Sequence, residues 1–419
     1  MPPWRWVVRN DADSAATRIT PTHLILSLLA ITGLALFILA CRPSWSPDGE
    51  KVLYSYWDDG ANKTAVAVFD RKTRTSRVMF EWWDENKNDT KIAGAQWTKD
   101  GQKAIVAIYE EHGVQLLALP VSAQKPIQAF TLEKMGESAF LPYPEVGRNL
   151  FLIAGDDLVR VNLENGEIFR VETKAKADSL LYDAGDKVFY LSQVMQKPAE
   201  EKQAREQSDS KKQNEMPSLW ELGELDQRDL TFHPWLTLRQ DELEAKNFGD
   251  FTGFLDVEPR TSRIVATEGS REGKPAKILV MGKNGIERVL DAGLPGKSYE
   301  LGNPQWSRDG KTVYASVLID VEKNNEKEFA VLEVPLDGEA SRIDRILDGP
   351  GAEFDSDYLT YTQIALSPDG KLIAATNGHK KDTQPEKRGL YLLDVSRADR
   401  PVNFYPAPAL PAVQRRNKE

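Results

Sequence analysis

Acidic side chains are the most numerous groups in this chain that could do chemistry, with 64 aspartates and glutamates against four histidines. Two carboxylates held at a defined separation can act as acid and base when the pKa of one is raised. Three acidic groups lie near expected loop ends: Asp58-Asp59, Asp156-Asp157 and Glu353-Asp355-Asp357. A solvated loop explains such groups more simply, so we assign no catalytic residue to them.

Other catalytic patterns are missing from the sequence. It holds neither the Gly-x-Ser-x-Gly turn that carries a hydrolase nucleophile nor the Ser-x-Asp-x-Gly pattern of sialidases. The four histidines are not paired at the spacing of metal ligands: His23, His112, His233 and His379. We therefore expect a protein that is not an enzyme and that needs no cofactor.

One segment has the spacing of a calcium loop, with oxygen-bearing side chains at every second position. These side chains are Asp84, Asn86, Asn88 and Thr90. The glycine expected at the sixth position of such a loop and the glutamate expected at the twelfth are both missing, so calcium is only a minor alternative. The neighbouring Trp82 and Trp83 cannot both face one side of a strand. We expect one of them to contact a partner or the lipid headgroups.

Cys41 is the only cysteine of the 419 residues, and it directly follows an apolar run of 17 residues from Leu24 to Ala40. Ile38-Leu39-Ala40-Cys41 resembles the leader of a bacterial lipoprotein at three of four positions, and the Cys41 thiol could accept diacylglycerol. The run also has the length of a short membrane span, for which the N-terminal arginines would stay in the cytoplasm. Both interpretations stay open, and both place the rest of the chain outside the cytoplasm, on a membrane of the cell envelope.

The charge of the chain disfavours nucleic acid as a partner. The net charge is −10, and no basic stretch interleaved with aromatic residues offsets it. With one cysteine the chain cannot form an internal disulfide, so its stability must come from packing.

A five-residue pattern recurs four times and predicts a repeat architecture. Its copies are Trp45-Ser46-Pro47-Asp48-Gly49, Trp97-Thr98-Lys99-Asp100-Gly101, Trp306-Ser307-Arg308-Asp309-Gly310 and Leu366-Ser367-Pro368-Asp369-Gly370. In each copy we expect a tight turn between two strands, in which glycine supplies a positive φ and aspartate bonds backbone amides. We expect the tryptophans to fill the gaps between adjacent repeats.

The spacing of these copies predicts seven units. Trp45 and Trp97 are 52 residues apart, Trp306 and Leu366 are 60 apart, and the 209 residues between Trp97 and Trp306 divide into four steps of about 52. Degenerate turns in that interval lie at residues 145–148, 183–186 and 258–261. Every unit shows four short apolar runs separated by polar turns, which predicts an all-β, seven-bladed β-propeller of four-stranded blades.

The expected organisation has three parts. Residues 1–41 form a leader with a hydrophobic helix, residues 42–406 form the propeller, and residues 407–419 form a flexible tail, frayed or packed along the rim. The expected blades are 43–90, 92–134, 138–174, 179–240, 246–298, 302–348 and 359–406, with a charged insertion at 197–217 that we expect to be a loop. Because each unit has its own four strands, we expect the ring to close by face packing, without a strand shared between its two ends.

The Trp-Ser-Pro-Asp-Gly turn, followed by a lysine and an apolar strand, resembles the WD-like repeat of TolB-type β-propellers over residues 43 to 406. The propeller domains of dipeptidyl peptidase IV and prolyl oligopeptidase relatives share this repeat. The resemblance implies a propeller that binds protein partners. The motif itself is specific for the fold and uninformative about the ligand. The separate N-terminal domain of TolB is missing here, so nothing is expected to transfer beyond the propeller.

We therefore expect a non-catalytic, membrane-tethered propeller, a single copy of which binds another protein or an envelope polymer. The alternative is a propeller hydrolase or lyase that acts on a glycan with carboxylates at the central funnel. A sensor ectodomain is a third possibility, disfavoured because the segment before the apolar run is short.

Overall fold

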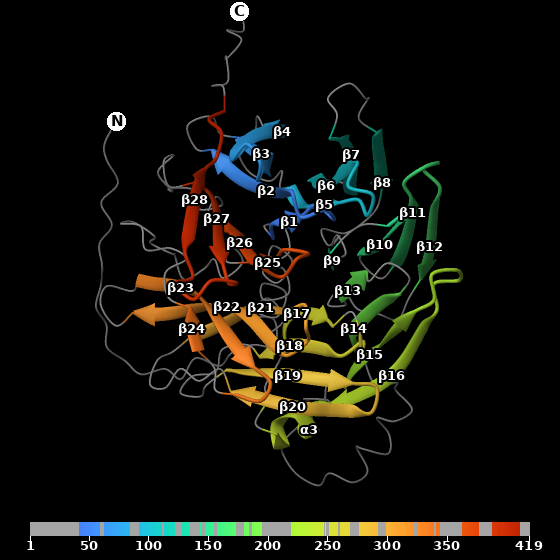
Figure 1. Ribbon diagram of the computed structural model, residues 1–419. Coiled ribbons are helices and arrows are strands. Elements are labelled where there is room, and N and C mark those ends of the chain that lie inside the picture. The colour runs from blue at the N-terminus through green and yellow to red at the C-terminus, as the bar shows by residue number, and fades with distance from the viewer. Residues whose placement is uncertain are drawn as a thin grey trace, which may run out of the picture.

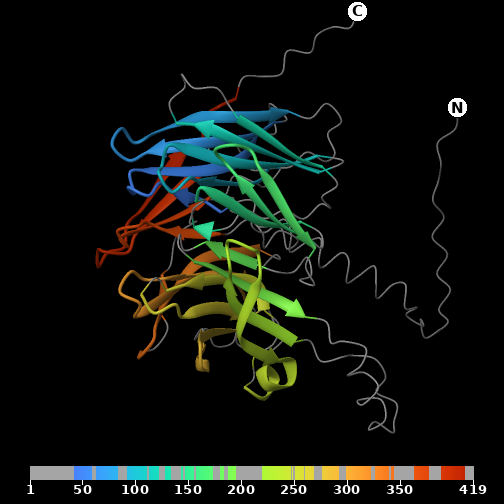
Figure 2. The same ribbon diagram turned by 90° about the vertical axis from the view of Figure 1, so that its right-hand side faces the viewer.

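The computed structural model describes residues 42–58, 63–83, 92–110, 113–121, 128–133, 143–144, 147–154, 157–172, 180–183, 187–194, 219–246, 248, 251–258, 260–268, 276–291, 299–321, 326–338, 341–343, 363–376 and 388–410. Seven sheets stand around a common centre (Figure 1), and Figure 2 shows the same ring turned by 90°. The predicted all-β, seven-bladed propeller is confirmed.

Five of the seven blades have four strands that follow one another in chain order from the centre outwards. The first two blades are β1 (Ser44–Trp45), β2 (Lys51–Asp58), β3 (Lys63–Asp70), β4 (Thr75–Trp83), and β5 (Ile92–Trp97), β6 (Lys103–Glu110), β7 (Gly113–Pro120), β8 (Gln128–Glu133). The fifth blade is β17 (Phe251–Val257), β18 (Ile264–Glu268), β19 (Lys277–Gly282), β20 (Gly285–Asp291). The sixth and seventh are β21 (Tyr299–Trp306), β22 (Thr312–Val321), β23 (Glu326–Pro335), β24 (Ser341–Ile343), and β25 (Ile364–Leu366), β26 (Leu372–Thr376), β27 (Gly389–Asp394), β28 (Val402–Pro406).

The third and fourth blades depart from the expected four strands each. The third is a sheet of three, β10 (Asn149–Ala154), β11 (Asp157–Asn162) and β12 (Ile168–Glu172). The fourth has five, because β9 (Tyr143–Pro144) pairs in parallel with the innermost strand of β13 (Leu180–Asp183), β14 (Val188–Val194), β15 (Leu219–Leu225) and β16 (Phe232–Arg239). A short helix, α3 (Gln240–Ala245), follows the fourth blade.

The core lies between neighbouring blades. The middle strands are buried on both faces, so their sequences read as continuous apolar runs, as in β3, where Lys63 to Phe69 are all buried. Between the fifth and sixth blades, Val265 and Ile278 pack against Leu301 and Val313. Each fully buried side chain of this size contributes about 1.5–3 kcal/mol through the hydrophobic effect.

The ring closes as the sequence predicted. The sheet of the first blade consists of β1 to β4 and that of the seventh of β25 to β28, so the described residues share no strand across this junction. Residues 407–410, expected to begin a tail that is frayed or packed along the rim, are packed: they continue from β28 across to the first blade, where Leu410 is buried.

Several predictions lie outside the described residues. These are the N-terminal hydrophobic helix, Cys41, the calcium-like segment 84–90, the insertion 197–217, Asp59, Asp156 and the group Glu353, Asp355 and Asp357. Among the helices that the structure describes, none has the length and apolar composition needed to cross a membrane.

Candidate functional site at the centre of the ring

The four repeat turns are built from the same hydrogen bonds. In the first, the Ser46 hydroxyl donates to Asp48 Oδ1 over 2.5 Å, and the same carboxylate oxygen accepts the backbone N–H of Glu50 over 3.0 Å. The turns at Asp100, Asp309 and Asp369 repeat both bonds. The Ser307 hydroxyl and then the Lys311 N–H lower the pKa of Asp309 below its usual 3.8, so this carboxylate is ionised at neutral pH. We call the surface formed by residues 46–50, 98–102, 307–311 and 367–371 the turn face.

Each repeat glycine lies against the turn of the preceding blade. A Cβ at Gly101 would stand 3.4 Å from Cδ of Pro47, and one at Gly49 would stand 3.6 Å from Cδ of Pro368. Gly49 and Gly101 also have φ of 69° and 65°, where L-residues are strained. The motif therefore encodes a contact between blades as well as a turn within one blade.

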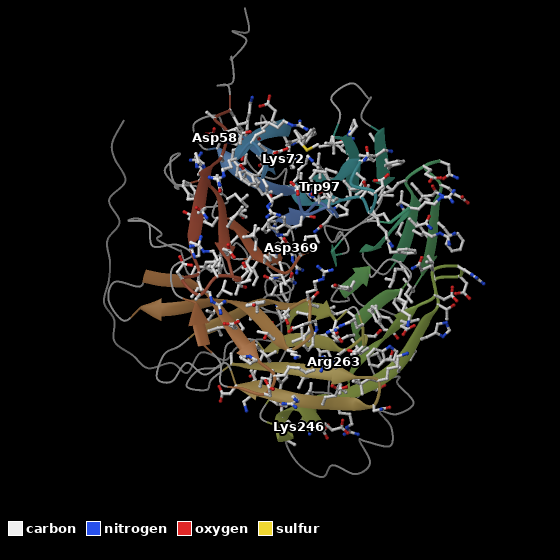
Figure 3. All side chains as sticks on the ribbon, in the orientation of Figure 1. Asp58, Lys72, Trp97, Lys246, Arg263 and Asp369 are labelled. Carbon is white, nitrogen blue, oxygen red and sulfur yellow. The ribbon has the colours of Figure 1, made fainter. Side chains whose placement is uncertain are left out.

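The three repeat tryptophans lie between adjacent blades. The indole N–H of Trp45 donates to the Ala365 carbonyl over 2.8 Å, and that of Trp97 donates to the Ser44 carbonyl over 2.9 Å. In Figure 3, Trp97 lies near the centre of the ring, by β1 and β5. Trp306 packs against Val265 of the fifth blade, under the guanidinium of Arg263 at 4.9 Å from the ring centroid. These residues hold the ring together.

Polar side chains on the innermost strands bond the backbone of the next blade. Ser44 Oγ accepts the N–H of Trp97 over 3.4 Å, Asp256 Oδ2 accepts that of Trp306 over 2.6 Å, and Gln305 Oε1 accepts that of Leu366 over 3.2 Å. Each acceptor directly precedes the aromatic or apolar residue that begins the repeat turn of its own blade. Because an innermost strand has no neighbour on its inner edge, these side chains satisfy backbone groups that would otherwise be buried without a partner.

Among the described residues, Asp256 is the carboxylate whose pKa is clearly raised. It is 5% exposed, and burial raises its pKa to about 6, although the positive charge of Arg42 and the Trp306 N–H act in the opposite direction. Arg42, just before β1, also donates from Nε to the Ile364 carbonyl of the seventh blade over 3.3 Å. Asp256 was not among the site residues predicted from the sequence. The available signal was a polar residue directly before the first turn residue of a blade, as in Ser44 and Gln305.

The fifth blade lacks the glycine of the repeat and replaces it with a charged cluster. Glu258 is fully buried, 3.2 Å from Arg260 Nε and 3.7 Å from Arg263 Nε. Arg263 also donates to the Gly310 carbonyl over 2.8 Å, and Arg260 donates to that of Asp309. Ser262, with φ of 58°, takes the left-handed conformation that glycine has elsewhere. The cluster thus binds the turn of the sixth blade through two hydrogen bonds.

The remaining predicted residues are not gathered at this centre. Trp82 is half-buried and packs beside Phe80 against the core between the first two blades, while the side chain of Trp83 lies outside those described. Asp58 pairs with Arg388 at the junction of the first and seventh blades. His233 lies exposed on β16. Within the ranges given above, no three His, Cys, Asp or Glu side chains are grouped so that they could hold a metal ion.

Comparisons with known proteins agree with the fold. No protein-family model and no curated protein matches the sequence. A chain in the crystal structure of a mitotic checkpoint complex is similar, with 13% identity, a TM-score of 0.50, and coverage of 88% of this chain and 90% of that one. TolB from Acinetobacter baumannii has 12% identity, a TM-score of 0.41, and coverage of 78% and 72%.

A third similar structure is the propeller domain of the Trilobed protease from Pyrococcus furiosus, described as having an open velcro topology. Its identity is 12%, its TM-score 0.47, and the coverage is 88% of this chain and 98% of that one. At such low identities a structural likeness concerns the fold alone. The chain is thus a seven-bladed β-propeller similar in structure to other propellers, and this likeness does not identify its function.

Proposed function

We propose that this protein is a non-catalytic β-propeller, tethered to a membrane of the bacterial cell envelope, that binds another protein or an envelope polymer. The proposal rests on one observation, namely which groups the central polar side chains bond. Ser44, Asp256 and Gln305 each bond the backbone of the next blade, so the polar groups where a propeller enzyme would place its catalytic residues are engaged in holding the ring.

The path of the chain into the ring favours one orientation on the membrane. β1 runs towards the turn face, so the chain enters β1 from the opposite side. Arg42 is 4% exposed and bonded to Ile364, and it stands two residues after Ala40, where the apolar run ends. Almost no chain therefore separates a membrane tether at residues 24–41 from the ring. Such a tether directs the entry side towards the lipid and the turn face towards the aqueous compartment.

The turn face is suited to binding because it is rigid. Its turns are closed by side-chain hydrogen bonds and braced against one another through Gly49, Gly101 and their neighbouring prolines. Lys99, Arg308 and Lys371 stand exposed on it. A backbone that is already ordered before binding loses little entropy on binding, which favours affinity.

Site-specific photo-crosslinking tests the proposal. A photoreactive residue replaces Lys99 or Lys371 on the turn face, or Asn403 on the outer strand β28 as a matched exposed control. We expect both turn-face positions, and not Asn403, to crosslink to the same partner in intact cells. The binding of that partner to the purified full-length protein is then measured. Failure of both turn-face positions to crosslink, or crosslinking from Asn403 alone, would show that the turn face is not the binding surface.

The tether is tested separately by the intact mass of the membrane-extracted protein and of a Cys41→Ala variant. A wild-type chain that begins at Cys41 with added lipid supports the lipoprotein leader, whereas an unmodified chain retained in the membrane supports a spanning anchor. A chain recovered entirely without membranes argues against either tether.

A second function, hydrolysis or elimination of a glycan, is favoured by one observation. Burial raises the pKa of Asp256 to about 6, which would suit a general acid if this carboxyl gave up its bond to the Trp306 N–H and met a substrate. Asp256→Asn distinguishes the two functions, because it would abolish glycan turnover in an enzyme and leave crosslinking from Lys99 unchanged in a binding module.

A further inference from the structure

The junction between the first and seventh blades differs from the other six in its connectivity. Every other pair of neighbouring blades is joined by the polypeptide itself, whereas the first and seventh are joined by non-covalent contacts alone. Near the centre these contacts are the hydrogen bonds from Trp45 to Ala365 and from Arg42 to Ile364. Since no loop restrains this junction, its opening is opposed only by the contacts made there.

A short C-terminal segment crosses this junction. We define residues 407–410 as the C-terminal segment. At its beginning, the Ala407 N–H donates to the Arg388 carbonyl of the seventh blade over 2.8 Å. On the first blade, the Tyr56 hydroxyl donates to the Pro408 carbonyl over 2.7 Å, and the Leu410 N–H donates to Asp58 Oδ2 over 3.4 Å. The segment is therefore bonded to both blades.

Leu410 adds an apolar contact on the same side. It is 9% exposed and belongs to a cluster with Trp45 and Tyr56 of the first blade and Leu390 and Leu392 of the seventh. The cluster thus contains side chains of both blades together with the end of the C-terminal segment. Removing Leu410 would expose part of this shared core.

Asp58 connects all three parts of the junction. Its Oδ1 accepts the guanidinium of Arg388 over 3.1 Å, while its Oδ2 accepts the Leu410 N–H. The side chains of Arg388 and Asp58 are 5% and 15% exposed, so solvent screens this pair much less than a surface pair. Figure 3 shows Asp58 at the edge of the first blade, near β27 and β28.

We propose that the C-terminal segment is a clasp that holds the first and seventh blades together and takes the place of a shared strand. With the clasp released, the ring opens at this junction before any other blade unfolds. The proposal is independent of what the turn face binds.

Hydrogen exchange on the full-length protein in detergent, compared with two truncations, tests the clasp. One truncation lacks residues 407–419, and the control lacks only residues 411–419, which keeps every contact described above. We expect the first to exchange at least about tenfold faster at β1, β2 and β25 to β28, with the third to fifth blades unchanged, because the loss of three hydrogen bonds and an apolar contact lowers the local opening energy. The control should exchange as the wild type. Unchanged exchange in the first truncation, or a rise equal in all blades, would overturn the proposal.

A point substitution keeps the test informative if that truncation does not fold. Tyr56→Phe removes only the hydroxyl that bonds Pro408. Tyr190→Phe is the matched control, since the buried Tyr190 hydroxyl has no hydrogen-bond partner within the described part of the chain. Faster exchange at β25 to β28 in Tyr56→Phe, and not in Tyr190→Phe, supports the clasp, while equal behaviour of the two variants contradicts it.

Discussion

Asn303 of the sixth blade makes a two-way hydrogen bond to a single residue of the seventh, Ile364. Its Nδ2 donates to the Ile364 carbonyl over 2.8 Å, and its Oδ1 accepts the Ile364 N–H over 2.9 Å. The amide side chain therefore pairs with the edge of β25 as a neighbouring strand would. Asn303 is fully buried, so solvent cannot replace either bond.

Asn303→Ala should destabilise the protein by about 2–4 kcal/mol, because it removes both bonds and leaves buried backbone groups without this partner. Urea unfolding followed by tryptophan fluorescence measures the change. Asn403→Ala on β28 is the control, since Asn403 is exposed and its loss should cost less than about 0.5 kcal/mol. Equal effects of the two substitutions would show that the paired bonds do not stabilise this junction.

Trp97→Phe should cost about 1–2 kcal/mol more than Trp306→Phe. Both substitutions shrink a buried indole, but only Trp97→Phe removes a hydrogen bond, the one to the Ser44 carbonyl. The indole N–H of Trp306 is buried with no hydrogen-bond partner among the described residues. The comparison is made by thermal unfolding of the two variants, and a larger loss for Trp306→Phe would contradict this account.

Gly310→Ala should destabilise the protein by at least about 1 kcal/mol more than Gly166→Ala. The two glycines have similar φ, 68° and 76°, so the backbone strain of an alanine is the same at both. A Cβ at Gly310 would lie 2.6 Å from Oε1 of the buried Glu258, whereas one at Gly166 would meet only Phe130 at 3.4 Å. Chemical denaturation of both variants measures the difference. Similar losses would mean that Glu258 moves aside.

Asp256 should make the free energy of unfolding fall as pH rises. Burial raises the pKa of Asp256 from 3.8 to about 6 in the folded protein, so between these values the folded state binds more protons than the unfolded state. The stabilisation present below pH 4 is lost as pH approaches 6, and the pKa difference corresponds to about 3 kcal/mol. Asp256→Asn should remove this fall when unfolding is measured from pH 4 to 7.

Asp309→Asn provides a control of opposite sign when the measurement is extended below pH 4. The pKa of Asp309 is lowered by Ser307 and Lys311, so its contribution is present above pH 4 and is lost as pH falls further. An Asp256→Asn variant with an unchanged pH dependence between 4 and 6 would show that the carboxylate is not held in the buried setting described.

The repeat turns were predictable because local chemistry specifies them. The spacing of Trp45, Trp97 and Trp306 gave the number of blades, and the Asp-Gly pairs gave the position of each first hairpin. The pairing of Tyr143–Pro144 with β13 was not predictable, because two residues carry no periodic signal and a parallel pair forms between separate units. The turn at 258–261 was located by spacing alone, because Ser262 takes the conformation that usually indicates glycine.

The central polar residues were harder to find from sequence. Asp256 and Asn303 interrupt apolar runs, and such an interruption resembles the end of a strand unless the acceptor in the next blade is known. The role of residues 407–410 was hidden for a similar reason. A proline-rich end is typical of a frayed tail. Pro408 and Leu410 come to lie beside Tyr56 and Asp58 only when the ring has closed.

The absence of a shared strand among the described sheets has a consequence for how such a ring can evolve. Each blade except the fourth is one uninterrupted stretch of chain, so duplication or deletion of a gene segment can add or remove a whole blade without splitting a sheet. The exception is the stretch from β9 to β16, in which the fourth blade takes its innermost strand from the segment preceding β10. We expect the third and fourth blades to be inherited as a pair, because deleting a segment that holds β9 together with the third blade would leave the inner edge of β13 bare.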